Sequence, residues 1–471
     1  METVNGAALR MTAIRKTFPG VVALDGVDLE LNPGEVHALV GENGAGKSTL
    51  AQIAFGTLRA DSGTVAARGT VGLVHQHFQL VGRLRVWQNV LLGREPRSGL
   101  RIDAAAAHRA VRDLAERNGL EIDPDAFVDE LPVAARQRVE LLRELYRNPS
   151  VLLLDEPTAA LAPAEIDRFF ATVTTLAREG TAVLVVTHKL AEVVAYTQRV
   201  SVLRRGKMVA RFETAATSVD EIARAMVGGD LPAIAARQSV ELQPCVKLTG
   251  VSAGEGASAV SRVTFDVRGG EIVGIAGVEG NGQNAIADAI AGMIPFHGSI
   301  EVPRTGIVPQ DRHLEALVLG WSIVDNAVLG RQHALRRGAV VDRARARSDA
   351  ASIVSRFDLR ATSVDAPVRT LSGGNQQKLV VGRALIDDPP FVLAYQPTRG
   401  IDVGAATLVG SRLIEARNAG AGVLLISFDL DEIFALADRI LVLYRGAIVG
   451  EFSSAGADRA RIGRLMAGAA A

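Results

Sequence analysis

"GENGAGKST", residues 41–49, lies between the apolar segment "EVHALV" and the helical pattern "KSTLAQIAFGTL". A glycine-rich loop of this composition between a strand and a helix matches the phosphate-loop pattern. Its glycines let the backbone curl so that N–H groups point at phosphate oxygens, and the helix N-terminus adds partial positive charge. The motif predicts an α/β domain that binds phosphates at this loop.

Two side chains of the loop supply most of its chemistry. Lys47 brings a positive charge to the β- and γ-phosphates, and Ser48 offers its hydroxyl to Mg²⁺. The candidate binding residues of the loop are Gly41, Glu42, Asn43, Gly44, Ala45, Gly46, Lys47, Ser48 and Thr49.

Acidic residues follow a second apolar strand, "VLLLDEP", residues 151–157. Asp155 is expected to hold the magnesium, and Glu156 to orient and deprotonate the attacking water. His188 follows the strand "TAVLVVT" and is a candidate for contacting the γ-phosphate. Gln76, in "VHQHF", is a candidate for reaching both the magnesium and the water. Phe18 precedes Gly41 by 23 residues and is a candidate for stacking on adenine, although an aromatic there equally fits a hydrophobic core.

The bulk composition excludes several function classes. Lys plus Arg and Asp plus Glu both number 52, so the zero net charge argues against nucleic-acid binding by bulk charge. The single cysteine, Cys245, excludes a disulfide within the chain and suits a reducing cytosol. The N-terminus has no apolar stretch of signal-peptide length, and no apolar run approaches the roughly 20 residues that span a bilayer. These runs are typical of buried parallel strands, so we expect membrane attachment only through a partner.

The chain contains an internal repeat. The segment "VDLELNPGEVHALVGENGAGKS" from Val27 aligns with "VTFDVRGGEIVGIAGVEGNGQN" from Val263. Further on, "LLDEPTAAL" aligns with "LAYQPTRGI". Matches at a nearly constant shift over separated segments predict two homologous α/β domains, residues 1–232 and 246–471, with a linker at 233–245.

The order of phosphate loop, glutamine, signature, acid pair and histidine resembles the ATP-binding domains of ABC transporters. The tandem arrangement is similar to the fused ATPase subunits of bacterial sugar and nucleoside importers. The segments "GVEGNGQ", "YQPTRGIDVGA" and "VGLVHQHFQLV" look most like importers of nucleosides that use lipoprotein receptors. The resemblance implies two tandem phosphate-loop domains, each with a predominantly parallel sheet, an antiparallel β part and a helical subdomain.

The same resemblance implies cofactors, partners and a location. The cofactors are ATP and Mg²⁺. The partners are two transmembrane permease subunits and an extracytoplasmic solute-binding lipoprotein, with no nucleic acid. The location is the cytoplasmic face of the inner membrane, where the chain is peripheral and contacts the membrane only through the permeases.

In this family each ATP lies between the phosphate loop of one domain and the signature, Leu-Ser-Gly-Gly-Gln, of the other. The second half carries "LSGGNQQK", residues 371–378, which makes Ser372, Gly373, Gly374 and Asn375 candidate ATP-binding residues. The first half carries "LPVAARQR", residues 131–138, in which Pro132 replaces the signature serine.

The second half also lacks the catalytic groups. The replacements are Lys47 by Gln283, Ser48 by Asn284, Asp155 by Tyr395, Glu156 by Gln396 and His188 by Phe428. All these replacements therefore fall on one composite site, formed by the phosphate loop of the second domain and the signature of the first. This distribution predicts one hydrolytic site and one inert site per chain.

Three alternatives stay open, of which a pure ATP-binding module without hydrolysis is disfavoured by Glu156 and His188. Of the other two, the first is the ATPase subunit of an importer for ribose, galactose or xylose, whose relatives more often retain an acid pair in the second half. The second is a soluble ABC protein that acts on ribosomes or DNA. Such proteins usually keep two competent sites and a long charged linker, neither of which this sequence has.

Overall fold

The computed structural model describes residues 6–75, 78–99, 101–158, 161, 163–229, 234–338, 340–466 and 468. Gln76, the candidate for magnesium and water, lies outside the described residues. The chain divides into two compact units, residues 1–230 and 231–471.

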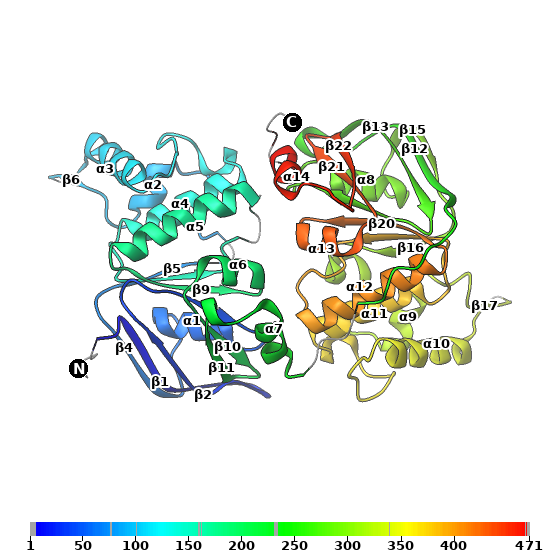
Figure 1. Ribbon diagram of the computed structural model, residues 1–471, viewed down its shortest axis with the longest axis horizontal. Helices are drawn as coiled ribbons and strands as arrows, with labels where there is room; N and C mark the ends of the chain where they lie inside the picture. The colour runs from blue at the N-terminus through cyan, green and yellow to red at the C-terminus, as the bar shows by residue number, and fades with distance from the viewer. Residues whose placement is uncertain are drawn as a thin grey trace. The chain divides into compact units, whose positions relative to one another are not determined.

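The larger sheet of the first unit has six strands (Figure 1). Their order is β11 (Lys207–Glu213), β10 (Arg199–Arg204), β3 (Val36–Val40), β9 (Ala182–Thr187), β8 (Val151–Asp155) and β5 (Val71–Val74). Neighbours pair in parallel, apart from the antiparallel pair β10 and β11. The phosphate loop and the acid pair thus follow parallel strands, at the sheet edge where ligands bind in such folds.

Helices cover both faces of this sheet. They are α1 (Lys47–Phe55), α2 (Val86–Leu91), α3 (Ala104–Arg117), α4 (Val133–Leu145), α5 (Pro163–Arg178), α6 (Leu190–Tyr196) and α7 (Val219–Val227). Alternate residues of β8 serve two cores: Val151 and Leu153 pack on the α1 side, whereas Leu152 and Leu154 pack with α2 to α5. Burial on both faces explains why the strand is apolar throughout.

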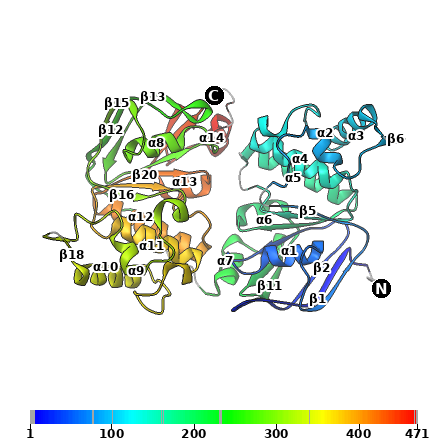
Figure 2. The ribbon, with the colours of Figure 1, turned by 180° about the vertical axis from the view of Figure 1, so that it is seen from behind.

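A smaller antiparallel sheet completes the first unit. It consists of β2 (Val21–Leu31), β1 (Leu9–Phe18) and β4 (Ser62–Ala67), in that order. Figure 2 shows α1 beside β1 and β2, and the core on this side joins α1 to both sheets. The short hairpin strands β6 (Arg97–Ser98) and β7 (Arg101–Ile102) precede α3.

The second unit repeats this plan (Figures 1 and 2). Its larger sheet runs β16 (Thr305–Val308), β19 (Phe391–Tyr395), β20 (Gly422–Ser427), β14 (Ile272–Ala276), β21 (Arg439–Tyr444) and β22 (Ala447–Ser453), and only the last pair is antiparallel. Its smaller sheet runs β13 (Val260–Gly269), β12 (Gln243–Ala253) and β15 (Phe296–Glu301). The hairpin β17 (Arg336–Arg337) and β18 (Val340–Val341) corresponds to β6 and β7.

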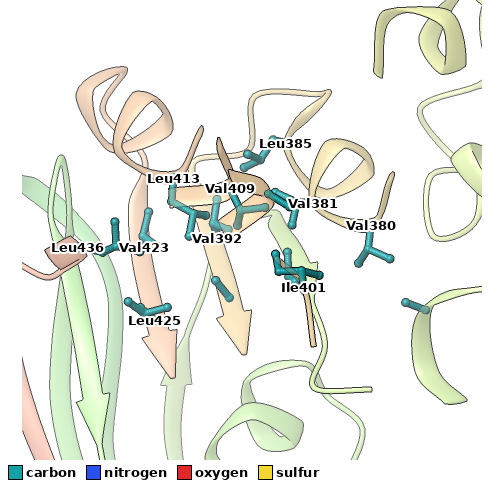
Figure 3. Close-up of a cluster of buried hydrophobic side chains, with 14 of the residues drawn as sticks. Val380, Val381, Leu385, Val392, Ile401, Val409, Leu413, Val423, Leu425 and Leu436 are labelled. Atoms are coloured by element: carbon teal, nitrogen blue, oxygen red, sulfur yellow. The ribbon is translucent and has the colours of Figure 1, made fainter. Parts of the chain in front are cut away.

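The helices of the second unit follow the same order. They are α8 (Gln283–Ile290), α9 (Ile323–Val328), α10 (Arg343–Arg356), α11 (Gly373–Leu385), α12 (Val403–Asn418), α13 (Leu430–Leu436) and α14 (Arg459–Met466). Figure 3 shows apolar side chains of α11 and α12 meeting those of β19 and β20, with Val381, Val409 and Val392 among them.

The predicted fold class is confirmed in both units: a mostly parallel sheet, an antiparallel part and a helical part at α2 to α4 and α9 to α11. None of the helices in the described ranges is long and apolar enough to cross a bilayer.

The segment after residue 233 is fastened to the second unit. Asn418 Nδ2 donates a hydrogen bond to the carbonyl of Ala236 (2.9 Å), and the N–H of Gln238 donates to Asn418 Oδ1 (3.1 Å). Arg237 donates to the carbonyl of Ala435 (2.7 Å). Most of the predicted linker therefore lies along the ends of α12 and α13, and β12 begins at Gln243.

Candidate functional site

The phosphate loop of the first unit joins β3 to α1. Gly44 (φ 81°) and Gly46 (φ 105°) adopt left-handed conformations that favour glycine. A Cβ atom at Gly46 would lie 2.5 Å from the carbonyl oxygen of Ala23, so a side chain is also excluded sterically. These two glycines thus permit the loop conformation that directs backbone N–H groups inward.

Lys47 lies inside this loop and is buried. Its Nζ donates to the carbonyl oxygens of Gly41 (2.7 Å) and Glu42 (3.1 Å). Burial lowers the pKa of the ammonium group, while the carboxylates of Glu156 and Asp155 oppose that shift. The predicted cation and the predicted acids therefore share one site.

Asp155 ends β8 and accepts a hydrogen bond from the side chain of Ser48. Burial raises the pKa of the Asp155 carboxyl, although the bond from Ser48 and the charge of Lys47 counteract part of the effect. Its Oδ1 is buried and has no hydrogen-bond partner among the described residues. A buried oxygen of this kind is suited to a cation.

Glu156 follows with a left-handed backbone (φ 47°), held by a hydrogen bond from its N–H to the carbonyl of Val186 (2.8 Å). His188 Nδ1 lies 3.0 Å from Glu156 Oε1. Burial alone would raise the pKa of the Glu156 carboxyl, but the hydrogen bond from His188 and the nearby cationic side chains outweigh it and lower that pKa. Glu156 is therefore an ionised carboxylate at neutral pH, as a general base requires.

Three further residues, which the sequence reasoning missed, support this acid. Lys189 Nζ donates to the carbonyl of Thr158 (3.0 Å) and pairs with Glu192 Oε1 (3.3 Å). Glu192 Oε2 accepts from the Thr158 hydroxyl (2.6 Å). These bonds tie the segment after Glu156 to the start of α6. The available signal was the spacing of Lys189 and Glu192 directly after His188.

Phe18 ends β1 at the turn into β2, and 44% of its surface is exposed. It is therefore outside the hydrophobic core, which removes the alternative of a core aromatic. Lys16 Nζ lies 5.8 Å from the ring centroid. Stacking of the ring on adenine stays a prediction.

In the second unit, Gln283 takes the place of the lysine. Its amide is buried, donating from Nε2 to the carbonyl of Val278 (3.1 Å) and accepting at Oε1 from the N–H of Asn281 (3.1 Å). The Gln283 amide is thus hydrogen-bonded to backbone groups of its own loop. Glu279 adds a negative charge to a loop that has no cation.

Neutral side chains fill the position that corresponds to Ser48 and Asp155. The Tyr395 hydroxyl donates to Asn284 Oδ1. Asn284 Nδ2 donates to Gln310 Oε1 (3.3 Å), and Gln310 Nε2 contacts Glu279 Oε1 (3.5 Å). We call Tyr395, Asn284, Gln310 and Glu279 the polar chain. Burial raises the pKa of Tyr395, so its hydroxyl stays protonated and can donate.

The counterparts of the metal-binding acid Asp155 and of the histidine form an apolar contact. The rings of Tyr395 and Phe428 meet edge to face at 6.2 Å. Gln396 keeps the left-handed backbone of Glu156 (φ 50°), and its buried Nε2 has no partner among the described residues. The backbone of a catalytic site is retained without its acids.

The predicted signature residues lie at the start of α11. Ser372 is the N-cap, and its Oγ accepts from Asn375 N (3.4 Å) and Asn375 Nδ2 (3.0 Å). A Cβ atom at Gly374 would lie 3.1 Å from Asp402 Oδ2, so the glycine fits a crowded position. In the first unit α4 begins after Pro132, which gives no side-chain cap. The helix α4 thus begins at the position equivalent to the start of α11, but Pro132 lacks the hydroxyl and the N–H of the signature serine.

Comparisons with known proteins agree with this geometry. The model of the ABC transporter family matches residues 24–159 and 260–399. The nucleoside import ATP-binding protein NupA of Lactococcus lactis subsp. cremoris is 38% identical, over 98% of this chain and 99% of its own length. The ribose import ATP-binding protein RbsA 1 of Streptomyces avermitilis is 40% identical, over 98% of this chain and 92% of its own length.

Among solved structures, the archaeal ribosome recycling factor aABCE1 shares the fold. Its TM-score is 0.68 at 18% identity, over 94% of this chain and 90% of that one. At such low identity the likeness concerns the fold alone. The family match, the two full-length relatives and the two phosphate-loop units lead to one conclusion: the chain belongs to the ABC transporter family and is an ATPase.

Proposed function

We propose that the chain is the energy-coupling subunit of a nucleoside importer, with one hydrolytic ATP site and one inert site. The observation that carries the two-site proposal is the contrast between the units. Lys47, Asp155, Glu156 and His188 converge in the first, whereas the polar chain fills the same position in the second. By family resemblance, the hydrolytic site is completed by the signature of the second unit, at Ser372 to Asn375.

The first unit fits a magnesium ion. Ser48 and Asp155 are hydrogen-bonded to each other, and Asp155 has a buried oxygen without a partner among the described residues. These two side chains would hold Mg²⁺ with Gln76, and the ion would neutralise charge on the phosphates. In the second unit, Asn284 and Tyr395 supply no carboxylate at these positions, which supports the assignment of an inert site.

The roles of the remaining residues follow from their contacts. Glu156 accepts a proton from the attacking water at a carboxylate oxygen. His188 holds that carboxylate by its 3.0 Å contact. Lys47 exchanges its bonds to the loop carbonyls for phosphate oxygens when ATP binds.

Replacing Ser372 with alanine tests the cross-domain assignment. We expect the ATPase kcat to fall about tenfold or more, since the γ-phosphate loses a donor that is preorganised at the helix N-terminus. The measurement is steady-state phosphate release by the full chain, with its melting temperature as a check on folding.

Pro132 provides the matched control, because it occupies the equivalent position in the first unit. Pro132→Ala should leave hydrolysis unchanged. Wild-type kcat in Ser372→Ala, or an equal loss in Pro132→Ala, would contradict the assignment of the signature in trans.

The cargo proposal rests on two observations. "AYQPTRG" in the second unit lacks both acids, which resembles nucleoside importers more than sugar importers. The relative NupA is named for nucleoside import. The alternative is a simple-sugar importer, and the specific observation in its favour is the 40% identity to a protein named for ribose import.

Partner contact is proposed at a groove of about 660 Å³ in the second unit, between α8, β16, residues 314–318 and the end of α11. Leu314 (87% exposed) and Met293 (74%) give it an apolar wall. Asp288 and Glu315 line it too, and burial raises the pKa of both carboxyls. Arg304, Arg331 and Arg383 balance these acids in the lining, so the apolar wall fits an apolar helix from a permease on the cytoplasmic side.

A single experiment addresses cargo and partners. The chain is co-expressed with the permeases and the solute-binding lipoprotein encoded beside it, and nucleosides and sugars are screened for stimulated ATP hydrolysis. Co-purification with the permeases and stimulation by nucleosides alone support the proposal. Stimulation by ribose, galactose or xylose alone would contradict the nucleoside proposal and support the sugar importer. Co-purification with ribosomes would reject both importer proposals.

A further inference from the structure

The second unit has an insertion between its glutamine and the following helix. Asn89 hydrogen-bonds both backbone groups of Val81, and Asn326 does the same with Val318, so the two asparagines are equivalent. Asn326 follows Gln310 by 16 positions, whereas Asn89 follows Gln76 by 13. The three extra residues lie in a π-helical turn, η4 (Arg312–Ala316). Such turns often mark functional sites.

Asp311 fixes this turn. Its Oδ1 accepts from the N–H of His313 (2.8 Å) and of Leu314 (3.0 Å). At the other end Arg383 of α11 donates to the carbonyl of Ala316 (2.8 Å). The turn is therefore held at both ends, and its side chains have defined directions.

Arg312 extends from the turn to the signature. Its Nη1 donates to the carbonyl of Arg399 (3.0 Å), in the loop after β19. A Cβ atom at Gly373 would lie 3.0 Å from Nη2, and one at Gly400 would lie 3.5 Å from Nη1. The guanidinium thus lies between the first helical residue of the signature and the loop that follows Gln396.

Keeping a guanidinium there has an energetic cost. Burial lowers the pKa of Arg312, and the charge of Asp311 only partly opposes this effect. Its Nε is buried without a hydrogen-bond partner among the described residues. A cation held at a cost in folding free energy is typical of functional positions.

His313, the next residue, contacts the same helix from the side. Its Nε2 lies 2.8 Å from Gln376 Oε1. Gln376 Nε2 in turn donates to the carbonyls of Val368 and Leu371, both at 3.3 Å. The contact therefore reaches the backbone on which Ser372 is placed.

The opposite side of the turn faces the groove. Leu314 and Glu315 line it directly after Arg312 and His313. In the first unit the shorter segment is held at the middle of α4, where the N–H of Gln79 donates to Glu140 and Arg143 donates to the carbonyl of Gln79 (2.5 Å). The insertion is found in the unit that has the intact signature.

We propose that Arg312 and His313 are positioning residues that hold the signature of the second unit in register for hydrolysis and connect it to the groove. This inference rests on the proposed function, because it requires the signature to complete the hydrolytic site. The guanidinium fixes the start of α11 against the loop after β19, and its charge adds to the positive end of the helix where the γ-phosphate is expected. A segment that displaces Leu314 would move the signature through two adjacent residues.

The test uses the full chain in complex with its co-expressed permeases. Arg312→Ala is expected to lower the kcat for ATP about tenfold, as the loss of one charge-assisted hydrogen bond does. Arg312→Lys keeps the charge without the planar fork and should recover only part of that loss. His313→Ala should lower kcat less, and His313→Gln, which can still donate to Gln376, should restore it.

A double variant separates positioning from general destabilisation. Because Arg312 acts through the signature, Ser372→Ala with Arg312→Ala should hydrolyse no more slowly than Ser372→Ala alone. Arg347→Ala is the matched control, since it removes an arginine of the same unit whose ion pair with Asp365 lies at the surface. It should keep the wild-type kcat.

The outcomes distinguish this inference from the proposed function. If Ser372→Ala hydrolyses at the wild-type rate, the composite site itself is wrong. If Ser372→Ala is impaired but Arg312→Ala and His313→Ala are not, or if the effects of Ser372→Ala and Arg312→Ala multiply, the composite site stands and the positioning role is overturned. Should Arg312→Ala fail to fold, a wild-type kcat in both Arg312→Lys and His313→Ala overturns it equally.

Discussion

Replacing Lys47 with glutamine is expected to reduce ATP hydrolysis by about 100- to 1,000-fold, the scale on which loss of a preorganised electrostatic contact acts. The ammonium group is buried within the phosphate loop and 2.7 Å from the carbonyl of Gly41, where it can move onto phosphate oxygens. Glutamine is the residue that the second unit carries at this position, and there its amide binds the loop itself. The measurement is phosphate release under saturating ATP, with binding of labelled ATP in parallel.

The chain supplies its own control for this variant. Gln283→Lys places the lysine in the second unit, where Tyr395 and Gln396 still replace the acids. We expect unchanged hydrolysis from Gln283→Lys and no rescue in the double variant with Lys47→Gln. Rescue by the exchange would mean that the second loop is competent, and the proposal of one hydrolytic site would fall.

Replacing Glu156 with glutamine should abolish turnover and retain bound ATP. Because the contact with His188 and nearby cationic groups lower the pKa of Glu156 below the ordinary value of about 4.5, the carboxylate is ionised across neutral pH. An amide keeps the shape but accepts no proton, so we expect a loss of about 100-fold or more. A single-turnover measurement should find one labelled ATP per chain that is not converted to ADP.

The control here is Gln396→Glu, which restores a carboxylate to the second unit. It should not change the rate, since Asn284 and Tyr395 occupy the positions of the magnesium ligands there. Substantial remaining hydrolysis in Glu156→Gln would contradict the proposal. The lowered pKa also implies that protonation of Glu156 contributes no loss of activity as the pH falls from 8 to 6.

The sequence predicted those features that depend on local pattern. The phosphate loop and the strand "VLLLD" each lie within a short window, the two-fold repeat consists of matching segments at a nearly constant shift, and the motifs assigned the acids to the same site as Lys47. The loss of five catalytic groups in the second unit was also predicted by aligning the two halves of the sequence. Gln76, outside the described residues, stays a prediction.

Other features depend on distances between remote residues. The polar chain joins residues 279, 284, 310 and 395, and no window contains them all. The contacts of Arg312 with Arg399 and Gly373 span more than 60 positions for the same reason. The sequence indicated which groups were missing and which residues replaced them, whereas the structure showed how the replacing residues bond to one another.

His188 illustrates the intermediate case. The sequence placed it after the correct strand and suggested contact with the γ-phosphate, but its partner within the protein is Glu156, at 3.0 Å. A lone histidine gives no indication of its partner, because that depends on the left-handed backbone at Glu156. The spacing of Lys189 and Glu192 after His188 was a signal in the sequence, but their bonds to Thr158 became apparent only in the structure.

The polar chain makes the loss of the second site difficult to reverse. Tyr395→Asp alone would place a carboxylate in an apolar contact with Phe428 and leave Asn284 without its donor. Position 395 is buried, and an unpaired buried charge costs more than the roughly 1–3 kcal/mol of an unsatisfied buried polar group. Restoring the magnesium-binding acid therefore lowers stability before it yields any activity. We therefore expect sequence variation in evolution to be confined to inert forms of this unit. The division of labour between the two halves, once established, would then be effectively irreversible.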